Sequence, residues 1–143
     1  MELKSVFIDA NIFIDANDNT RRSYEQSFKI IPYLLSHNIK ILTSCDLITT
    51  IYYILSKKGR DEALDKIEQL NKICTIIDFS NKELLETTNL MREDKNFKDL
   101  EDTIQYVLAK NTNCDLVITN DKKFHSPDIE LFSSDDFIKK FDV

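Results

Sequence analysis

The chain has 143 residues, of which 42% are hydrophobic, and a formal net charge of −6. This size and composition fit one globular domain over residues 1–143 and exclude both a disordered chain and a membrane-spanning one. The negative charge argues against a protein that coats nucleic acid, but not against a nuclease whose carboxylates bind divalent cations. The sequence begins without a basic leader, so we expect a cytoplasmic protein with no membrane association.

Short β-branched runs alternate with apolar patterns of helical period along the whole chain. We expect strands at residues 3–8, 40–43, 75–78 and 115–119, with a fifth short strand at 130–132. We expect helices over residues 22–36, 45–57, 61–72, 81–92 and 99–111. The single glycine, Gly59, suits a left-handed cap after the second of these helices. The alternation predicts an α/β fold of three layers, with a central parallel sheet of about four to five strands.

Two apolar runs of the predicted strands are each followed at once by polar residues that include an aspartate. Asp9 comes directly after Val6-Phe7-Ile8, and Asp121 is the third residue after Leu116-Val117-Ile118. Ligands of parallel sheets sit just beyond the carboxyl ends of the strands. Taken singly, Asp9 is equally well explained by an Asx turn and Asp121 by a cap on the next segment. Their coincidence at two strand ends favours a shared site.

The helix predicted over residues 99–111 brings further acids to the same edge. Asp102 falls on a semi-apolar line of this helix, so it does not lie on a simply solvated face. Asp99, one turn earlier, is close enough to share a cation or steer a water, whereas Glu101 points elsewhere and is expected at the surface. Clusters of oxygen ligands suit Mg²⁺ or Mn²⁺ and not zinc.

The helix predicted over residues 45–57 also begins at this edge and carries Asp46 and Thr50. The better explanation of Asp46 is a first-turn acid that favours the helix dipole, and that of Thr50 is a tolerated polar residue. Lys122 and Lys123 adjoin Asp121 and are candidate phosphate contacts, although solvated surface lysines explain them equally well.

Three segments of the chain resemble the motifs of the PIN domain, the metal-dependent nuclease fold of VapC-type toxins in toxin–antitoxin systems. They are Phe-Ile-Asp-Ala-Asn-Ile at 7–12, Asp-Leu-Glu-Asp-Thr-Ile-Gln at 99–105 and Val-Ile-Thr-Asn-Asp-Lys-Lys-Phe at 117–124. Each motif alone is weak evidence, but together they are specific and span nearly the whole chain. A haloacid-dehalogenase-type phosphatase, in contrast, would need an aspartate where this chain has Asn11.

The resemblance implies roles for individual residues. It implies three metal-binding carboxylates, Asp9, Asp102 and Asp121, with Asp99 as a fourth catalytic acid. It also implies supporting polar residues, which are Asn11, Thr119 and Asn120. The activity implied is hydrolysis of RNA phosphodiester bonds by an endoribonuclease that uses Mg²⁺ or Mn²⁺. The implied partners are the RNA substrate and a cognate antitoxin, and a homodimer is a further candidate assembly.

The second acidic motif departs from the family pattern. Most relatives place a glutamate in the helix after the second strand, and Thr50 stands at that position here. A neutral hydroxyl supplies no negative charge, so the site either binds a second ion poorly or recruits Asp46 from one turn earlier. A PIN-like RNA-binding or protein-interaction module without catalysis is therefore the alternative function. His37 and His125 have no acidic partner at motif spacing and are expected at the surface or in loops.

Overall fold

The computed structural model describes residues 2–143 and contains a five-stranded sheet in which every paired strand is parallel. The strand order is β3-β2-β1-β4-β5. The strands are β1 (Ser5–Ile8), β2 (Lys40–Ser44), β3 (Thr75–Ile77), β4 (Leu116–Ile118) and β5 (Glu130–Phe132). The chain winds outward from β1 in both directions, so the boundary between β1 and β4 is the switch point where ligands of such sheets bind.

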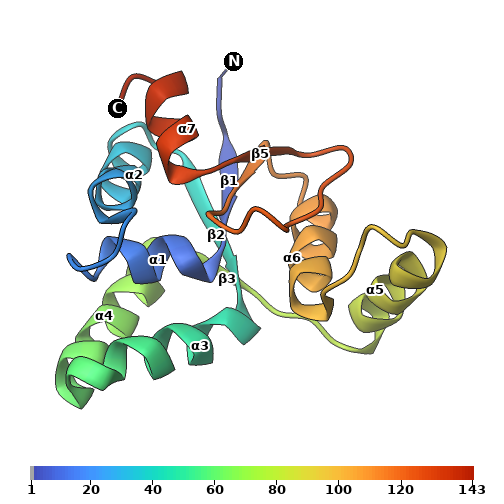
Figure 1. Ribbon diagram of the computed structural model, residues 1–143, viewed down its shortest axis with the longest axis horizontal. Helices are drawn as coiled ribbons and strands as arrows, with labels where there is room; N and C mark the ends of the chain where they lie inside the picture. Colours follow the sequence, from blue (N-terminus) through green and yellow to red (C-terminus); the bar gives the residue numbers. More distant parts are fainter. Residues whose placement is uncertain (1) are drawn as a thin grey trace.

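Helices cover both faces of the sheet (Figure 1). One face carries α1 (Ala10–Ala16), α2 (Tyr24–Ser36), α3 (Cys45–Leu55), α4 (Arg60–Ile73) and α7 (Ser134–Lys140). The other face carries α5 (Asn81–Glu93) and α6 (Leu100–Asn111). The predicted three-layer α/β/α fold with a parallel sheet is confirmed. No helix within residues 2–143 has the length and apolarity needed to cross a bilayer.

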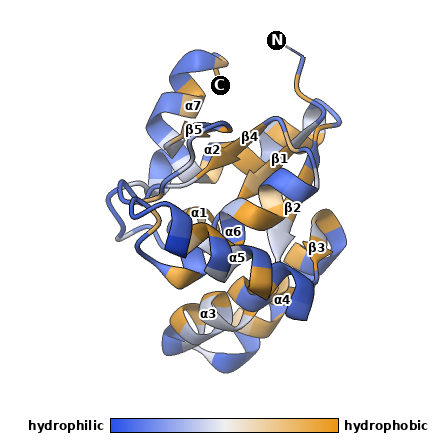
Figure 2. Cartoon of the chain, turned by 90° about the vertical axis from the view of Figure 1, so that its right-hand side faces the viewer, coloured by the Kyte–Doolittle hydropathy of each residue, from blue (hydrophilic) through white to orange (hydrophobic). Residues whose placement is uncertain are grey.

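The strands divide the apolar core into two clusters because successive side chains of a strand point to opposite faces. Val6 and Ile8 belong to the cluster under α1, α2 and α3, whereas Phe7 packs beneath α6. Figure 2 shows the hydrophobic strands inside and hydrophilic helix faces outside. Helix α6 is buried continuously from Thr103 to Ala109 because it packs against both the sheet and α5. This packing fixes the acidic first turn of α6 relative to the sheet.

Three details differ from the sequence-based expectations. Helices α1 and α7 were not predicted, because each has only 7 residues and so shows too little of a helical period. The helix expected over 45–57 ends at Leu55 and continues as a 3₁₀ turn, η1 (Ser56–Lys58). Gly59 does cap the end of this segment and has a positive φ of 155°, but its ψ of 137° is not left-handed helical, and the same residue also begins α4 as its N-cap.

Candidate active site

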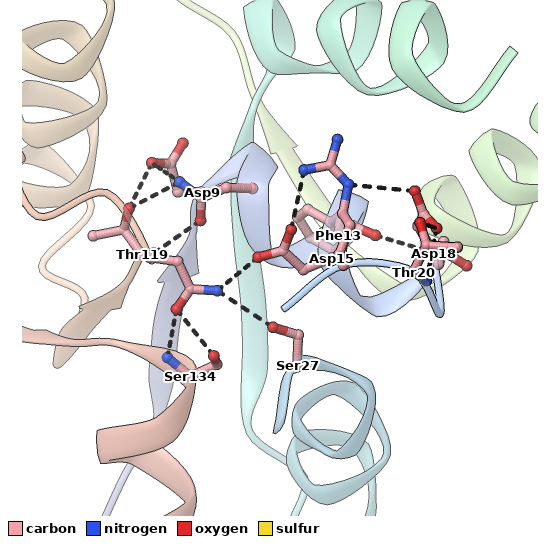
Figure 3. A network of polar contacts seen from close by, with 12 residues as sticks. Asp9, Phe13, Asp15, Asp18, Thr20, Ser27, Thr119 and Ser134 are labelled. Carbon is pink, nitrogen blue, oxygen red and sulfur yellow. Dashed lines mark hydrogen bonds and ion pairs between the residues drawn. The ribbon is translucent and has the colours of Figure 1, made fainter. Parts of the chain in front are cut away.

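Asp9 occupies the point where β1 ends and α1 begins. Its side chain is 5% exposed and accepts hydrogen bonds from the Ala10 amide at 2.8 Å and the Thr119 hydroxyl at 2.8 Å. The Asn11 amide group donates a third bond at 3.2 Å. Burial raises the pKa of Asp9 above its usual value, the charge of Asp121 adds to this rise, and the three hydrogen bonds oppose it. Figure 3 shows Asp9 facing Thr119 across the two central strands.

Thr119 connects the ends of β1 and β4. Its hydroxyl donates to Asp9 and accepts from the backbone N–H of Asp121 at 3.1 Å. The Asn11 side-chain oxygen accepts from the backbone N–H of Asn120 at 2.9 Å, which adds a second link. The backbone of residues 119–121 is therefore held against the start of α1, and Asp121 follows directly from this clamp.

The side chain of Asn120 joins three helices through hydrogen bonds to Asp15, Ser27 and Ser134, which are labelled in Figure 3. Its amide nitrogen donates to Asp15 of α1 at 2.9 Å and to Ser27 of α2 at 3.4 Å. Its oxygen accepts from the backbone N–H and the hydroxyl of Ser134, at the start of α7, at 2.8 and 3.0 Å. Both the nitrogen and the oxygen of the Asn120 amide are therefore hydrogen-bonded behind the acidic site. We call these contacts with Asp15, Ser27 and Ser134 the clasp.

The first turn of α6 brings Asp102 to Asp121. Asp99 caps the helix by accepting from the Asp102 backbone N–H at 2.9 Å. The Asp102 carboxyl group shares a hydrogen bond with Asp121, and desolvation, this bond and the charges of Asp9, Asp121 and Asp99 raise the pKa of Asp102 to about 8. The structure therefore brings Asp9, Asp102 and Asp121 to one place from three distant segments, with Asp99 beside them.

This acidic site has the donor chemistry for a hard divalent cation but is not preassembled around one. Within residues 2–143, no three His, Cys, Asp or Glu side chains stand ready to hold an ion together. Asp9 faces Asn11 and Thr119, and Asp102 faces Asp121, so side-chain rotation would have to precede binding. All donors are oxygens, and the crowding of like charges that raises the pKa of Asp102 is what a cation relieves.

A second acidic group adjoins the first on the side of α3. Asp46, in the first turn of α3, accepts two hydrogen bonds from the Gln105 amide group at 3.0 and 3.1 Å and one from the Ser44 hydroxyl. Burial and the charges of Asp46, Asp9 and Asp99 raise the pKa of Glu101. Glu101 is exposed as expected, but it lies at the rim of the acidic site. Thr50 forms no side-chain hydrogen bond within the described chain.

Gln105 is the site residue that the sequence analysis missed. It is fully buried and holds the carboxylate of Asp46 from across the site. Its position three residues after Asp102 places both side chains on one face of α6, which was the available signal. The hydrogen-bond partners of Asp46, Gln105 and Ser44, are both neutral side chains.

The stability of the chain should fall as pH rises from about 4 to about 8. In this window Asp102 keeps its proton in the folded state, where its pKa is about 8, and loses it in the unfolded state, where its pKa is 3.8. Because the folded state then binds more protons, ∂ΔG/∂pH is negative. In the presence of a chelator, we expect Asp102→Asn to remove about 1–2 kcal/mol of this dependence, after a discount for solvent screening. Urea unfolding at pH 5 and pH 8.5 gives the free energy of unfolding at each pH. If this free energy changed equally with pH in the parent and in Asp102→Asn, the prediction would be contradicted.

Comparison with known proteins identifies relatives over the whole chain. The sequence model of the PIN domain matches residues 5–123. Ribonuclease VapC1 of Aquifex aeolicus (strain VF5) is 44% identical over 143 residues, which cover 100% of this chain and 99% of that protein.

Solved structures share the fold. The structure of VapBC2 from Rickettsia felis, bound to a DNA fragment from its promoter, matches with a TM-score of 0.68 and 24% identity, covering 90% of this chain and 98% of that one. DNA-bound VapBC from Salmonella typhimurium matches with a TM-score of 0.70 and 16% identity, covering 92% and 99%. At these identities the likeness concerns the fold alone.

Proposed function

Because this chain belongs to the PIN-domain family, we propose that it is an endoribonuclease that hydrolyses RNA phosphodiester bonds with the help of a divalent cation. The observation that carries this proposal is the gathering of Asp9, Asp102 and Asp121 at the switch point of the sheet. The identity of 44% to a ribonuclease over the full length supports the reaction class.

Some residues of the site would bind the cation, and others orient the residues that bind it. Asp9, Asp102 and Asp121 would hold Mg²⁺ or Mn²⁺, which when bound activates a water and balances charge on the phosphate. Thr119 and Asn11 fix the orientation of the Asp9 carboxylate. Asp102 must first give up the proton that it holds against Asp121, because a carboxylate binds a cation only when ionised. Asp99 holds the backbone of Asp102 in place as the cap of α6.

The position of Asp46 favours a catalytic function over the alternative, which is an inactive RNA-binding or protein-interaction module. Thr50 leaves the usual acidic position of α3 neutral, but Asp46 supplies a carboxylate from one turn earlier, held by Gln105. We therefore propose that the charge lacking at Thr50 is provided by Asp46.

The proposed biological role is that of the toxin in a toxin–antitoxin pair. Similar folds occur in solved VapBC complexes from Rickettsia felis and Salmonella typhimurium, and a toxin–antitoxin complex from Klebsiella pneumoniae also matches, with a TM-score of 0.66. We propose a cognate antitoxin protein as the partner, the cytoplasm as the compartment and a homodimer as a candidate assembly.

Cation binding and RNA cleavage test the proposed function together. We expect cleavage of an RNA oligonucleotide in Mg²⁺ or Mn²⁺ and none in a chelator. At one hundred times its Kd, Mn²⁺ should stabilise the fold by about 2.7 kcal/mol, seen as a raised Tm. Asp121→Asn should lose both effects, and the exposed Asp61→Asn should retain both. Cleavage that persists in the chelator would refute the metal dependence, and RNA binding without cleavage would favour the inactive module.

A further inference from the structure

A cleft of about 650 Å³ opens beside the acidic site, and charges of both signs line it. Three of its carboxylates belong to that site, namely Asp99, Asp102 and Asp121. Three lysines line the same cleft, namely Lys98, Lys122 and Lys123. Among residues 2–143, none of these lysines forms an ion pair, although carboxylates precede Lys122 and follow Lys98 directly. The lysines are therefore free to meet an anion in the cleft.

The wall of the cleft that carries Lys98 is held in place by a hydrogen-bonded turn and a buried aromatic ring. The Asp94 carboxylate accepts from the backbone N–H of Asn96 at 2.9 Å, and the Asp94 carbonyl accepts from that of Phe97 at 3.2 Å. Phe97 is 4% exposed and packs against Tyr106, with ring centroids 5.1 Å apart. This tight turn, anchored by a buried ring, fixes the backbone that leads into Lys98.

His125 ties this wall to the segment that carries Lys122 and Lys123. Its ring meets Phe97 edge-on at 4.5 Å, and its Nε2 lies 3.5 Å from Oδ2 of Asp94. His125 lies in a loop, as expected, and its acidic neighbour Asp94 comes from a segment remote in sequence rather than from motif spacing. The two lysine-bearing segments form one connected wall of the cleft.

The cleft presents charged side chains, and its phenylalanine rings are buried. Phe97 and Phe124 are 4% and 5% exposed, and the third ring of the cleft, that of His125, packs edge-on against Phe97. Proteins that stack nucleic-acid bases do so on exposed rings, whereas contacts from lysine go to the phosphates. The lysines of this cleft therefore suit the backbone of a nucleic acid rather than its bases.

Building on the proposed ribonuclease function, we propose that Lys98, with Lys122 and Lys123, binds the phosphate next to the scissile one. The carboxylates of the acidic site repel the phosphates of an RNA strand unless positive charge offsets them. The net charge of −6 means that the protein as a whole does not attract RNA at long range either. A neighbouring phosphate held by these lysines would offset that repulsion at the point of cleavage. The substrate would then be a strand with at least two consecutive phosphates, recognised through its backbone.

Substrates with one and with several phosphates test this inference. For an RNA oligonucleotide, we expect Lys98→Gln/Lys123→Gln to raise KM about 25-fold, roughly fivefold for each lysine, with kcat unchanged. For bis(p-nitrophenyl) phosphate, which has one phosphate, KM should not change. Lys95→Gln, an exposed lysine outside the cleft, is the matched control, and Lys98→Arg/Lys123→Arg should restore KM.

Binding of a non-cleavable RNA analogue keeps the inference separate from the proposed function. Fluorescence anisotropy measures the affinity at several salt concentrations. The slope of the logarithm of the binding constant against the logarithm of the salt concentration should be smaller in magnitude by about 0.7 for each lysine removed. An unchanged slope, or an equal loss on the one-phosphate substrate, would overturn the inference. If the parent cleaves no substrate, the proposed function fails, and the salt slope still decides whether these lysines bind phosphate.

Discussion

Replacing Asp102 with asparagine should lower kcat/KM for RNA cleavage roughly 10³-fold while the fold remains intact. Asparagine keeps the shape of the side chain but cannot provide the negative charge that the proposed cation needs. The same change should stabilise the fold at pH 8.5, because it removes one of the crowded charges around Asp9 and Asp121. Activity should therefore fall while stability rises, as is common where like charges that repel one another are gathered in a functional site.

Single-turnover cleavage and urea unfolding on the same preparations would measure both effects. Asp61→Asn makes the same chemical change at an exposed position and should leave both quantities near the parent's values. A variant at Asp102 that cleaves RNA at the parental rate would remove Asp102 from the catalytic group. A loss of activity together with a loss of stability would instead indicate that Asp102 is structural.

The sequence predicted the sheet and its acidic edge because both depend on local patterns. Val6-Phe7-Ile8 and Leu116-Val117-Ile118 are strand-like in themselves, and parallel topology then requires their carboxyl ends to meet. Asp9 and Asp121 come together for that reason alone. Helix α1 was not predicted, because its 7 residues show too little of a helical period, and burial of most of them leaves no polar face to mark one.

The contacts around the site could not be predicted, because they join segments whose relative placement depends on tertiary packing. The resemblance to the PIN domain grouped Asn120 with the supporting polar residues, but its side chain points toward α2 and α7, and α7 was itself not predicted. Likewise, the contact between Asp46 and Gln105 spans 59 positions of the sequence. Sequence patterns thus placed the carboxylates, and only the packed structure shows what holds each one.

Replacing Asn120 with aspartate should destabilise the fold by about 3 kcal/mol, because it turns a partly buried donor into a second carboxylate facing the buried Asp15. The nitrogen of Asn120 now lies 2.9 Å from the carboxylate of Asp15, which is 7% exposed. A loss of that size corresponds to a Tm lower by roughly 10 °C in a domain of this length. Thermal unfolding measures the change, and Asn89→Asp, exposed on α5, should stay within about 0.5 kcal/mol of the parent.

The exchange variant Asp15→Asn/Asn120→Asp separates this contact from a general effect of charge. It restores one donor opposite one acceptor, and the new aspartate still accepts from Ser134. We expect it to recover more than half of the lost stability. Cleavage should recover with it, because Asn120 lies between Thr119 and Asp121, and the clasp holds the backbone from which Asp121 reaches the site. If Asn120→Asp destabilised the fold no more than Asn89→Asp, the clasp would have no energetic role.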